Sequence, residues 1–133
     1  MKDVSGAVVL ITGAAMGMGR LFAERAVAER AAAVVLLDIN EEALAVTAGE
    51  LSGGTTLVHT EVVDVRRVTA LRAAARRIRK AVGAVDIVIN NAGIVRGNAY
   101  FWETDPVNDT QMTIEVNTVA PMLVAREFLP EMI

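Results

Sequence analysis

Four short apolar segments alternate with stretches of helical periodicity along the 133-residue chain. The apolar segments cover residues 8–12, 33–38, 56–63 and 85–89, and the second is unbroken from Ala33 to Leu37. Unbroken apolar runs of this length are typical of strands that are buried on both faces of a parallel sheet. Strands that alternate with helices predict an α/β fold in which helices cover both faces of the sheet.

Apolar residues three and four positions apart predict the helices between these strands. We expect a helix from Leu21 to about Arg30, one over 41–51 with Asn40 as its N-cap, and one over 66–82 whose arginines face water. The residues expected to face the sheet are Leu21, Phe22, Ala26 and Val27 in the first helix and Val68, Leu71, Ala75, Ile78 and Val82 in the third.

A last helix should follow an irregular loop over 94–108, with Asp109 or Thr110 as its cap. Pro121 lies within this helix and should bend it or interrupt its hydrogen bonding. The apolar residues that it carries include Ile114, Val116, Val119, Leu123, Val124 and Phe128. We do not expect all of them to find room against a four-stranded sheet.

The turn after the first strand carries three glycines in the pattern Thr12-Gly13-x-x-x-Gly17-x-Gly19. A strand, a tight glycine turn and a helix in succession predict the start of a dinucleotide-binding βαβ unit. Gly13 permits backbone angles that a side chain forbids, Gly17 allows the main chain to approach a pyrophosphate, and Gly19 allows the helix to pack closely. The start of the helix also favours a phosphate through its free N–H groups and its dipole.

The second strand ends in Asp38, about 20 residues after the last glycine. A carboxylate at this position can accept hydrogen bonds from the ribose hydroxyls of NAD, whereas it would repel the 2′-phosphate of NADP. Ile39 follows, with no lysine or arginine beside the acid. We therefore expect NAD rather than NADP, with a simple turn or cap acid as the alternative for Asp38.

The fourth predicted strand runs into Asn90-Asn91-Ala92-Gly93. Together with the glycine turn, this tetrapeptide resembles the short-chain dehydrogenase/reductase family over the whole chain. The resemblance implies a Rossmann-like, three-layer α/β/α fold with a parallel sheet in the order 3-2-1-4. It implies cofactor contacts at Gly13, Ala15, Met16, Gly17, Met18, Gly19, Asp38, Ile39, Asp64, Val65, Asn91, Ala92 and Gly93.

The resemblance also assigns individual roles. Asp64 and Val65 would hold the adenine ring, although from its position alone Asp64 is equally well explained as a helix cap. Met16 occupies a loop position where relatives that prefer NADP often carry a basic residue. Asn117 matches the asparagine that supports a proton-relay water, and the asparagine amides at 90 and 91 would stabilise the central sheet.

In the family, a serine, a tyrosine and a lysine carry out hydride-transfer chemistry with the nicotinamide, and they follow the asparagine helix. Residues 1–133 do not contain this set, since Tyr100 has Thr104 four places on. We therefore interpret residues 1–133 as one NAD-binding Rossmann domain, the cofactor-binding half of an enzyme that acts on a small alcohol or ketone. We expect it to be inactive alone and to form homo-oligomers through its last helix.

Composition narrows the remaining possibilities. A net charge of −3 gives no reason to expect nucleic acid or an anionic membrane as a partner. Because the chain contains no cysteine, disulfides are excluded. No apolar run approaches the roughly 20 residues that span a bilayer. A cytoplasmic location is the default expectation.

Tyr100, Phe101 and Trp102 either form the wall of a substrate site or cover the sheet. The alternative functions are a non-catalytic NAD-binding or assembly module and, less favoured, an S-adenosylmethionine-dependent methyltransferase.

Overall fold

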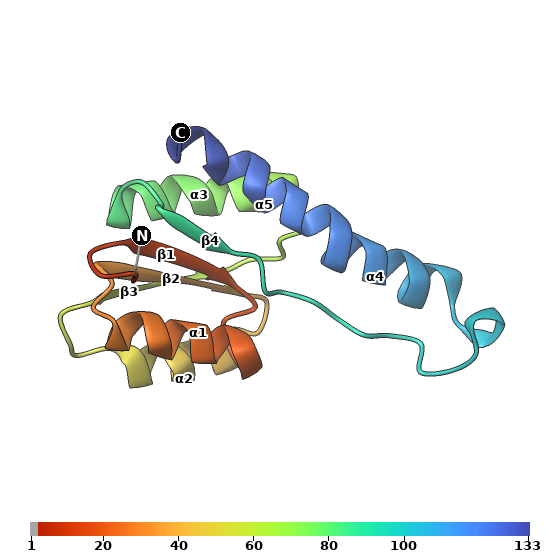
Figure 1. The fold of residues 1–133 in the computed structure, drawn as a ribbon. Coiled ribbons are helices and arrows are strands. Elements are labelled where there is room, and N and C mark those ends of the chain that lie inside the picture. Colours follow the sequence, from red (N-terminus) through yellow and green to blue (C-terminus); the bar gives the residue numbers. More distant parts are fainter. Residues whose placement is uncertain (1–2) are drawn as a thin grey trace.

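The computed structural model describes residues 3–133 and contains one parallel sheet of four strands (Figure 1). The strands are β1 (Val8–Thr12), β2 (Ala33–Asp38), β3 (Leu57–Val62) and β4 (Ile87–Ile89). They lie side by side in the order β3-β2-β1-β4, which confirms the predicted order. From β1 the chain adds β2 and then β3 on one side of β1, and it then crosses back to place β4 on the other side of β1. The direction in which strands are added therefore reverses between β1 and β4. Ligands of open α/β sheets bind outside the carboxyl ends of the strands at such a reversal.

Helices cover both faces of the sheet (Figure 1). α1 (Gly17–Ala28) and α2 (Glu41–Leu51) pack on one face, where Val9, Ile11, Val34 and Leu36 point toward them. α3 (Val68–Val82) and α5 (Ala120–Phe128) pack on the other. The second face is built from Val8, Leu10, Val35, Leu37, Leu71, Ala74, Ala75, Ile78, Val124 and Phe128. Successive strand residues alternate between the two cores, which explains why β1 and β2 read as unbroken apolar runs.

The first helix starts four residues earlier than predicted, at Gly17. Its buried residues are Gly19, Ala23 and Ala26, whereas Leu21 and Phe22 are 60% and 40% exposed, so their predicted burial was wrong. Small residues face the sheet because the helix leaves the glycine turn directly and approaches β1 closely. It ends at Ala28 rather than near Arg30.

Two features of α3 differ from the prediction. The helix begins at Val68, which is 42% exposed, so Arg66 belongs to the preceding turn. Several arginines are also paired rather than free in water: Arg77 binds the buried carboxylate of Glu61 at 2.7 Å. Arg79 binds Glu127 at 3.1 Å and Glu131 at 3.0 Å, and its guanidinium lies over the Phe128 ring. These pairs join α3 to β3 and to the end of the last helix.

The last helix begins at Pro106, with Asp105 rather than Asp109 or Thr110 as its cap. The Asp105 carboxylate accepts the N–H groups of Val107 at 2.9 Å and Asn108 at 2.7 Å. Two π-helical segments, Pro106–Gln111 and Glu115–Val119, flank α4 (Met112–Ile114), and α5 follows without a break.

Pro121 lies in the first turn of α5, directly after the second π-helical segment, so the expected local change in hydrogen bonding occurs there. Ala120, Val124 and Phe128 are buried, whereas Ile114 and Val119 are exposed. The first half of the helix extends past the sheet (Figure 1).

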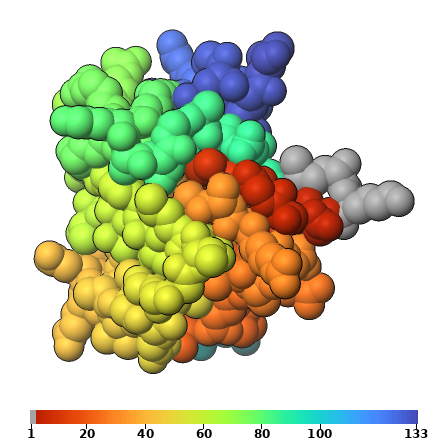
Figure 2. Space-filling model, turned by 90° about the vertical axis from the view of Figure 1, so that its left-hand side faces the viewer, coloured from red at the N-terminus to blue at the C-terminus, as the bar shows by residue number. Residues whose placement is uncertain are grey.

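Figure 2 shows the molecule from the left-hand side of Figure 1, the side on which the strands begin. The Asp86 carboxylate accepts the Val8 N–H at 2.8 Å, and the Asp86 N–H donates to the Val8 carbonyl. β4 has three paired residues, Ile87–Ile89, instead of the predicted five. No helix within residues 3–133 has the length and apolarity needed to cross a membrane.

Candidate dinucleotide site

Thr12 and Asn91 join the carboxyl ends of β1 and β4. The buried Thr12 hydroxyl accepts the N–H groups of Asn91 at 3.1 Å and Ala92 at 3.0 Å. The Asn91 side-chain amide donates to the carbonyls of Thr12 at 3.0 Å and Gly13 at 3.1 Å. Asn91 therefore braces the central sheet as the resemblance implied, whereas the Asn90 amide reaches the Pro121 carbonyl of α5 at 3.4 Å.

The glycine turn is held close to this junction. Gly13 has φ +65°, and a Cβ there would lie 2.9 Å from Ala92 Cα. A Cβ on Gly19 would collide with the Gly13 carbonyl and the Asn91 amide. At Gly17, with φ +56°, a Cβ would meet nothing within 4 Å. The first and third glycines thus serve packing, while the second leaves open backbone at the start of α1.

Asp38 lies at the carboxyl end of β2 and ties the glycine turn to it. Its Oδ2 accepts the Ala15 N–H at 2.9 Å, and its Oδ1 accepts the Asn40 N–H at 2.9 Å. An ionised carboxylate has about four acceptor sites, so two remain for a ligand. The side chain is half-buried, and its orientation is fixed by these two backbone groups.

Asp64 lies one strand further along, after β3, and is bound by Arg66. The Arg66 guanidinium holds the pKa of this carboxyl below its ordinary value through side-chain hydrogen bonds, the closest at 2.7 Å. Asp64 does not cap α3, whose N-cap position is Arg67. Of the two explanations left open by the sequence, the helix cap is therefore wrong.

Asn117 lies in the second π-helical segment and binds the loop after β4. Its Oδ1 accepts the Ile94 N–H at 2.8 Å and its Nδ2 donates to the Ile94 carbonyl at 2.8 Å. Both functional groups of the amide are used by the backbone of one residue. This pair holds the segment that follows Gly93 against the last helix.

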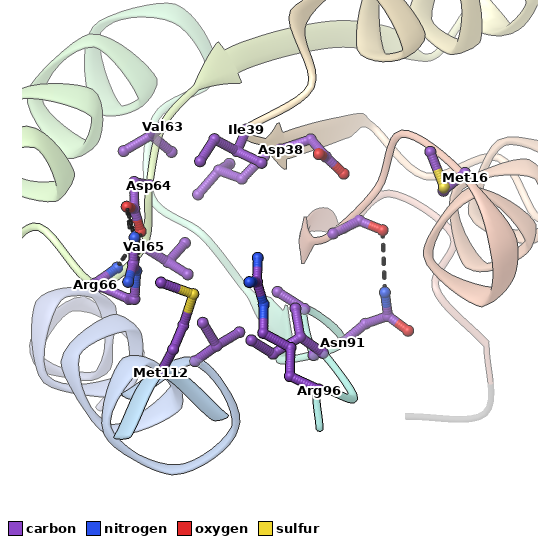
Figure 3. A pocket seen from close by; sticks show the side chains of 16 residues that line it. Met16, Asp38, Ile39, Val63, Asp64, Val65, Arg66, Asn91, Arg96 and Met112 are labelled. Carbon is purple, nitrogen blue, oxygen red and sulfur yellow. Dashed lines mark hydrogen bonds and ion pairs between the residues drawn. The ribbon is translucent and has the colours of Figure 1, made fainter. Parts of the chain in front are cut away.

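These elements enclose a cavity of about 500 Å³ at the carboxyl edge of the sheet, a volume typical of ligand sites (Figure 3). Nine of the expected site residues line it: Gly13, Met16, Asp38, Ile39, Asp64, Val65, Asn91, Ala92 and Gly93. Five others lie outside the lining: Ala15, Gly17, Met18, Gly19 and Asn117. Of these, Gly19 and Asn117 act through packing and hydrogen bonding, and Gly17 and Met18 are exposed at the start of α1.

The rest of the lining was not assigned to individual residues from the sequence, although the loop over 94–108 was expected to border the nicotinamide and substrate region. Arg66, Arg96, Met112 and Val116 also line the cavity. Figure 3 shows the Arg96 side chain extending into it from the loop after β4. Met112 and Val116 are four positions apart on one helical face, and this spacing is visible in the sequence. The loop sequence around Arg96, in contrast, does not indicate where the Arg96 side chain points.

The aromatic residues of the long loop are exposed. Tyr100, Phe101 and Trp102 are 68–77% exposed, so they do not cover the sheet. The rings of Tyr100 and Trp102 are stacked, with centroids 4.9 Å apart. None of the three lines the cavity described above.

Known proteins share this arrangement. A sequence profile described as short chain dehydrogenase matches residues 7–133. Estradiol 17-beta-dehydrogenase 11 of Pongo abelii is 40% identical over 131 residues, which make up 98% of this chain and 43% of that protein. Carveol dehydrogenase from Mycobacterium avium, solved in complex with NAD, has a TM-score of 0.89 at 28% identity and covers 99% of this chain and 51% of its own. A metagenomic short-chain oxidoreductase in complex with NADP has a TM-score of 0.86 at 30% identity, covering 97% and 57%.

A parallel sheet in the order β3-β2-β1-β4, with a glycine turn and a ligand-sized cavity at its carboxyl edge, defines a Rossmann-like α/β protein. The extent of the sequence match goes further: the chain belongs to the short chain dehydrogenase family. It spans about half the length of the curated relatives it matches.

Proposed function

We propose that residues 1–133 form the cofactor-binding part of a nicotinamide-dependent oxidoreductase that acts on a small alcohol or ketone. The observation that carries this proposal is the cavity between the glycine turn, Asp38 and the Asn91 turn. Its polar groups come from the carboxyl ends of all four strands, where dinucleotides bind in this class of sheet. Family membership supports the same chemistry.

The start of α1 suits the pyrophosphate. The first N–H groups of a helix have no partner within the helix, and its dipole is positive at that end. The space around Gly17 at this end is open, since a Cβ placed there would meet nothing within 4 Å. With its pyrophosphate held here, a nicotinamide cofactor would give a hydride to a ketone carbon or accept one from an alcohol carbon.

Asp38 suits the adenosine ribose and favours NAD. Two of its acceptor sites hold Ala15 and Asn40, and the two that remain can accept the ribose hydroxyls. A 2′-phosphate would bring a second negative charge to this carboxylate. Met16, which also lines the cavity, offers no compensating positive charge. Similar proteins have been solved with NAD and with NADP, so the preference between the two cofactors has to be measured on this chain.

A fluorescence titration with NADH and NADPH tests the proposal. We expect NADH to bind more tightly, and Asp38→Asn to weaken NADH by about 1–3 kcal/mol because a charged acceptor is lost. The same change should leave NADPH binding equal or stronger, since the repulsion is removed. Circular dichroism controls for folding. Tighter binding of NADPH by the unmodified chain would refute the NAD preference, and binding of neither cofactor would refute the proposed function.

A further inference from the structure

Met16 is the N-cap residue of α1, a position that methionine rarely fills. Its backbone is extended, as that of an N-cap residue ordinarily is, but its side chain makes no hydrogen bond to the helix. A serine, threonine, aspartate or asparagine at this position would offer an oxygen to the N–H groups of the first turn. The thioether sulfur of methionine is only a weak acceptor, so the side chain leaves this turn uncapped.

The N–H groups of the first turn are open as a result. In the described part of the chain, nothing accepts the N–H groups of Gly17, Met18 or Gly19. The N–H of Arg20 is the first to find an acceptor, the Met16 carbonyl at 3.3 Å. The open groups are those that the proposed function gives to the pyrophosphate, and the present inference rests on that proposal. A side chain that bound them would compete with the cofactor for the same donors.

The sulfur of Met16 is accessible to a small oxidant. The residue is 58% exposed and lines the cavity, and its sulfur is drawn in Figure 3. A peroxide converts exposed methionine to the sulfoxide, which methionine sulfoxide reductases convert back. With hydrogen peroxide, a lone pair of the sulfur attacks one oxygen, and the O–O bond breaks as the S–O bond forms. The other oxygen leaves with both hydrogens as water, so the sulfur is oxidised and the peroxide is reduced.

We propose that Met16 is an oxidation site whose sulfoxide caps α1 and thereby weakens the binding of the dinucleotide. The sulfoxide oxygen is a hydrogen-bond acceptor that carries partial negative charge. It lies as many bonds from Cα as the side-chain oxygen of glutamate, which spans the first turn of a helix in the capping box. The oxidised side chain therefore accepts an N–H group of this turn, and it places negative charge where the pyrophosphate would lie.

The test is a fluorescence titration with NADH before and after brief treatment with hydrogen peroxide. Peptide mass mapping shows which methionines carry the added oxygen, and the affinity of each protein is compared with that of its own untreated sample. We expect the unmodified chain with oxidised Met16 to bind NADH at least about tenfold more weakly, the value of one hydrogen bond to a charged group. Methionine sulfoxide reductases specific for the two epimers should restore the affinity.

Two leucine variants assign the loss to one sulfur. Met16→Leu removes the sulfur at similar volume but keeps Met18, which is 66% exposed and is also reached by peroxide. Its affinity for NADH should respond little to the treatment. Met122→Leu is the matched control, because Met122 is 63% exposed, lies in α5 and does not line the cavity. This variant should show the full loss. The same loss in oxidised Met16→Leu as in the unmodified chain, or no loss in an unmodified chain whose Met16 is oxidised, would overturn the proposal.

Amide hydrogen exchange tests the cap without a cofactor. Oxidation should slow the exchange of the Met18 and Gly19 N–H groups in the unmodified chain but not in Met16→Leu, because these are the groups that an N-cap side chain accepts. Unchanged exchange in the oxidised unmodified chain would overturn the proposal. Failure of the untreated chain to bind NADH or NADPH would instead refute the proposed function, and the exchange measurement would still decide whether the oxidised side chain caps α1.

Discussion

Gly19, in the first turn of α1, is the position where adding one methyl group perturbs the candidate site most directly. The chain offers a matched control in Gly49 of α2, where a Cβ would meet nothing within 4 Å. At Gly19 the same Cβ would collide with the Gly13 carbonyl and the Asn91 amide. The two Gly→Ala changes are chemically identical and both fall within helices, but they should change stability in opposite directions.

The expected magnitudes follow from these surroundings. Alanine is favoured over glycine within a helix by about 0.5–1 kcal/mol, so Gly49→Ala should stabilise the protein by that amount. At Gly19 the gain is outweighed by overpacking against backbone, which costs about 1–3 kcal/mol. Displacement of Asn91 also weakens its bonds to Thr12 and Gly13, each worth about 0.5–1.5 kcal/mol. We expect a net loss of about 1–4 kcal/mol for Gly19→Ala.

Urea unfolding followed by circular dichroism measures both changes. The midpoint should fall for Gly19→Ala and rise for Gly49→Ala, with an unchanged slope in each case. The Gly19 variant should also bind NADH more weakly, since the turn that approaches the pyrophosphate is displaced. A Gly19→Ala protein as stable as the unmodified chain would show that the turn is not packed as described.

Three further outcomes are expected. The folded-state pKa of Asp64 lies below its unfolded value of about 3.9, because Arg66 donates hydrogen bonds to the carboxylate. The contribution of Asp64 to stability is therefore present above that pH and is lost as the pH falls through the folded pKa. Arg66→Ala should make the free energy of unfolding depend less on pH in this acid range. Residues 1–133 alone should produce no NADH from secondary alcohols, and steady turnover by a chain of verified mass would contradict this. The same chain should self-associate at micromolar concentration through the exposed face of its last helix, around Ile114 and Val119, so a monodisperse monomer in light scattering would argue against the exposed-face reasoning.

The parts of the fold that could be predicted from the sequence are those set by short-range pattern. Buried parallel strands need residues that are apolar on both faces, so β1 and β2 were visible as continuous runs. The buried face of α1 could not be predicted in this way, because the depth at which a helix packs on a sheet depends on which of its residues allow close approach. Ala23 and Ala26 face the sheet, and the larger Leu21 and Phe22 remain outside. The cap of the last helix was also missed, because Asp105, Asp109 and Thr110 are all chemically suitable caps.

The candidate site divides in the same way. Strand-end residues such as Asp38 and Asn91 were foreseen because parallel strands deliver their carboxyl ends to one edge. Arg66 was assigned to a solvated helix face, although it bridges Asp64 and Glu115, which is 49 positions away. Such a contact depends on the path of the turn after β3 and on the placement of the last helix. Neither leaves a periodic signal in the sequence.

The short fourth strand has a consequence for the order in which the molecule assembles. Residues of β1 pair with residues of β2 that lie 25 positions later, whereas Val8 meets Asp86 across 78 positions and β4 contributes three paired residues. Closing a chain segment three times as long costs about 1 kcal/mol more in conformational entropy, and fewer ladder bonds offset it. We therefore expect β4 to dock after the β1-β2-β3 unit has formed. The Asn91 turn, which completes the cavity, should then form after the strands β1, β2 and β3 and open before them in hydrogen exchange.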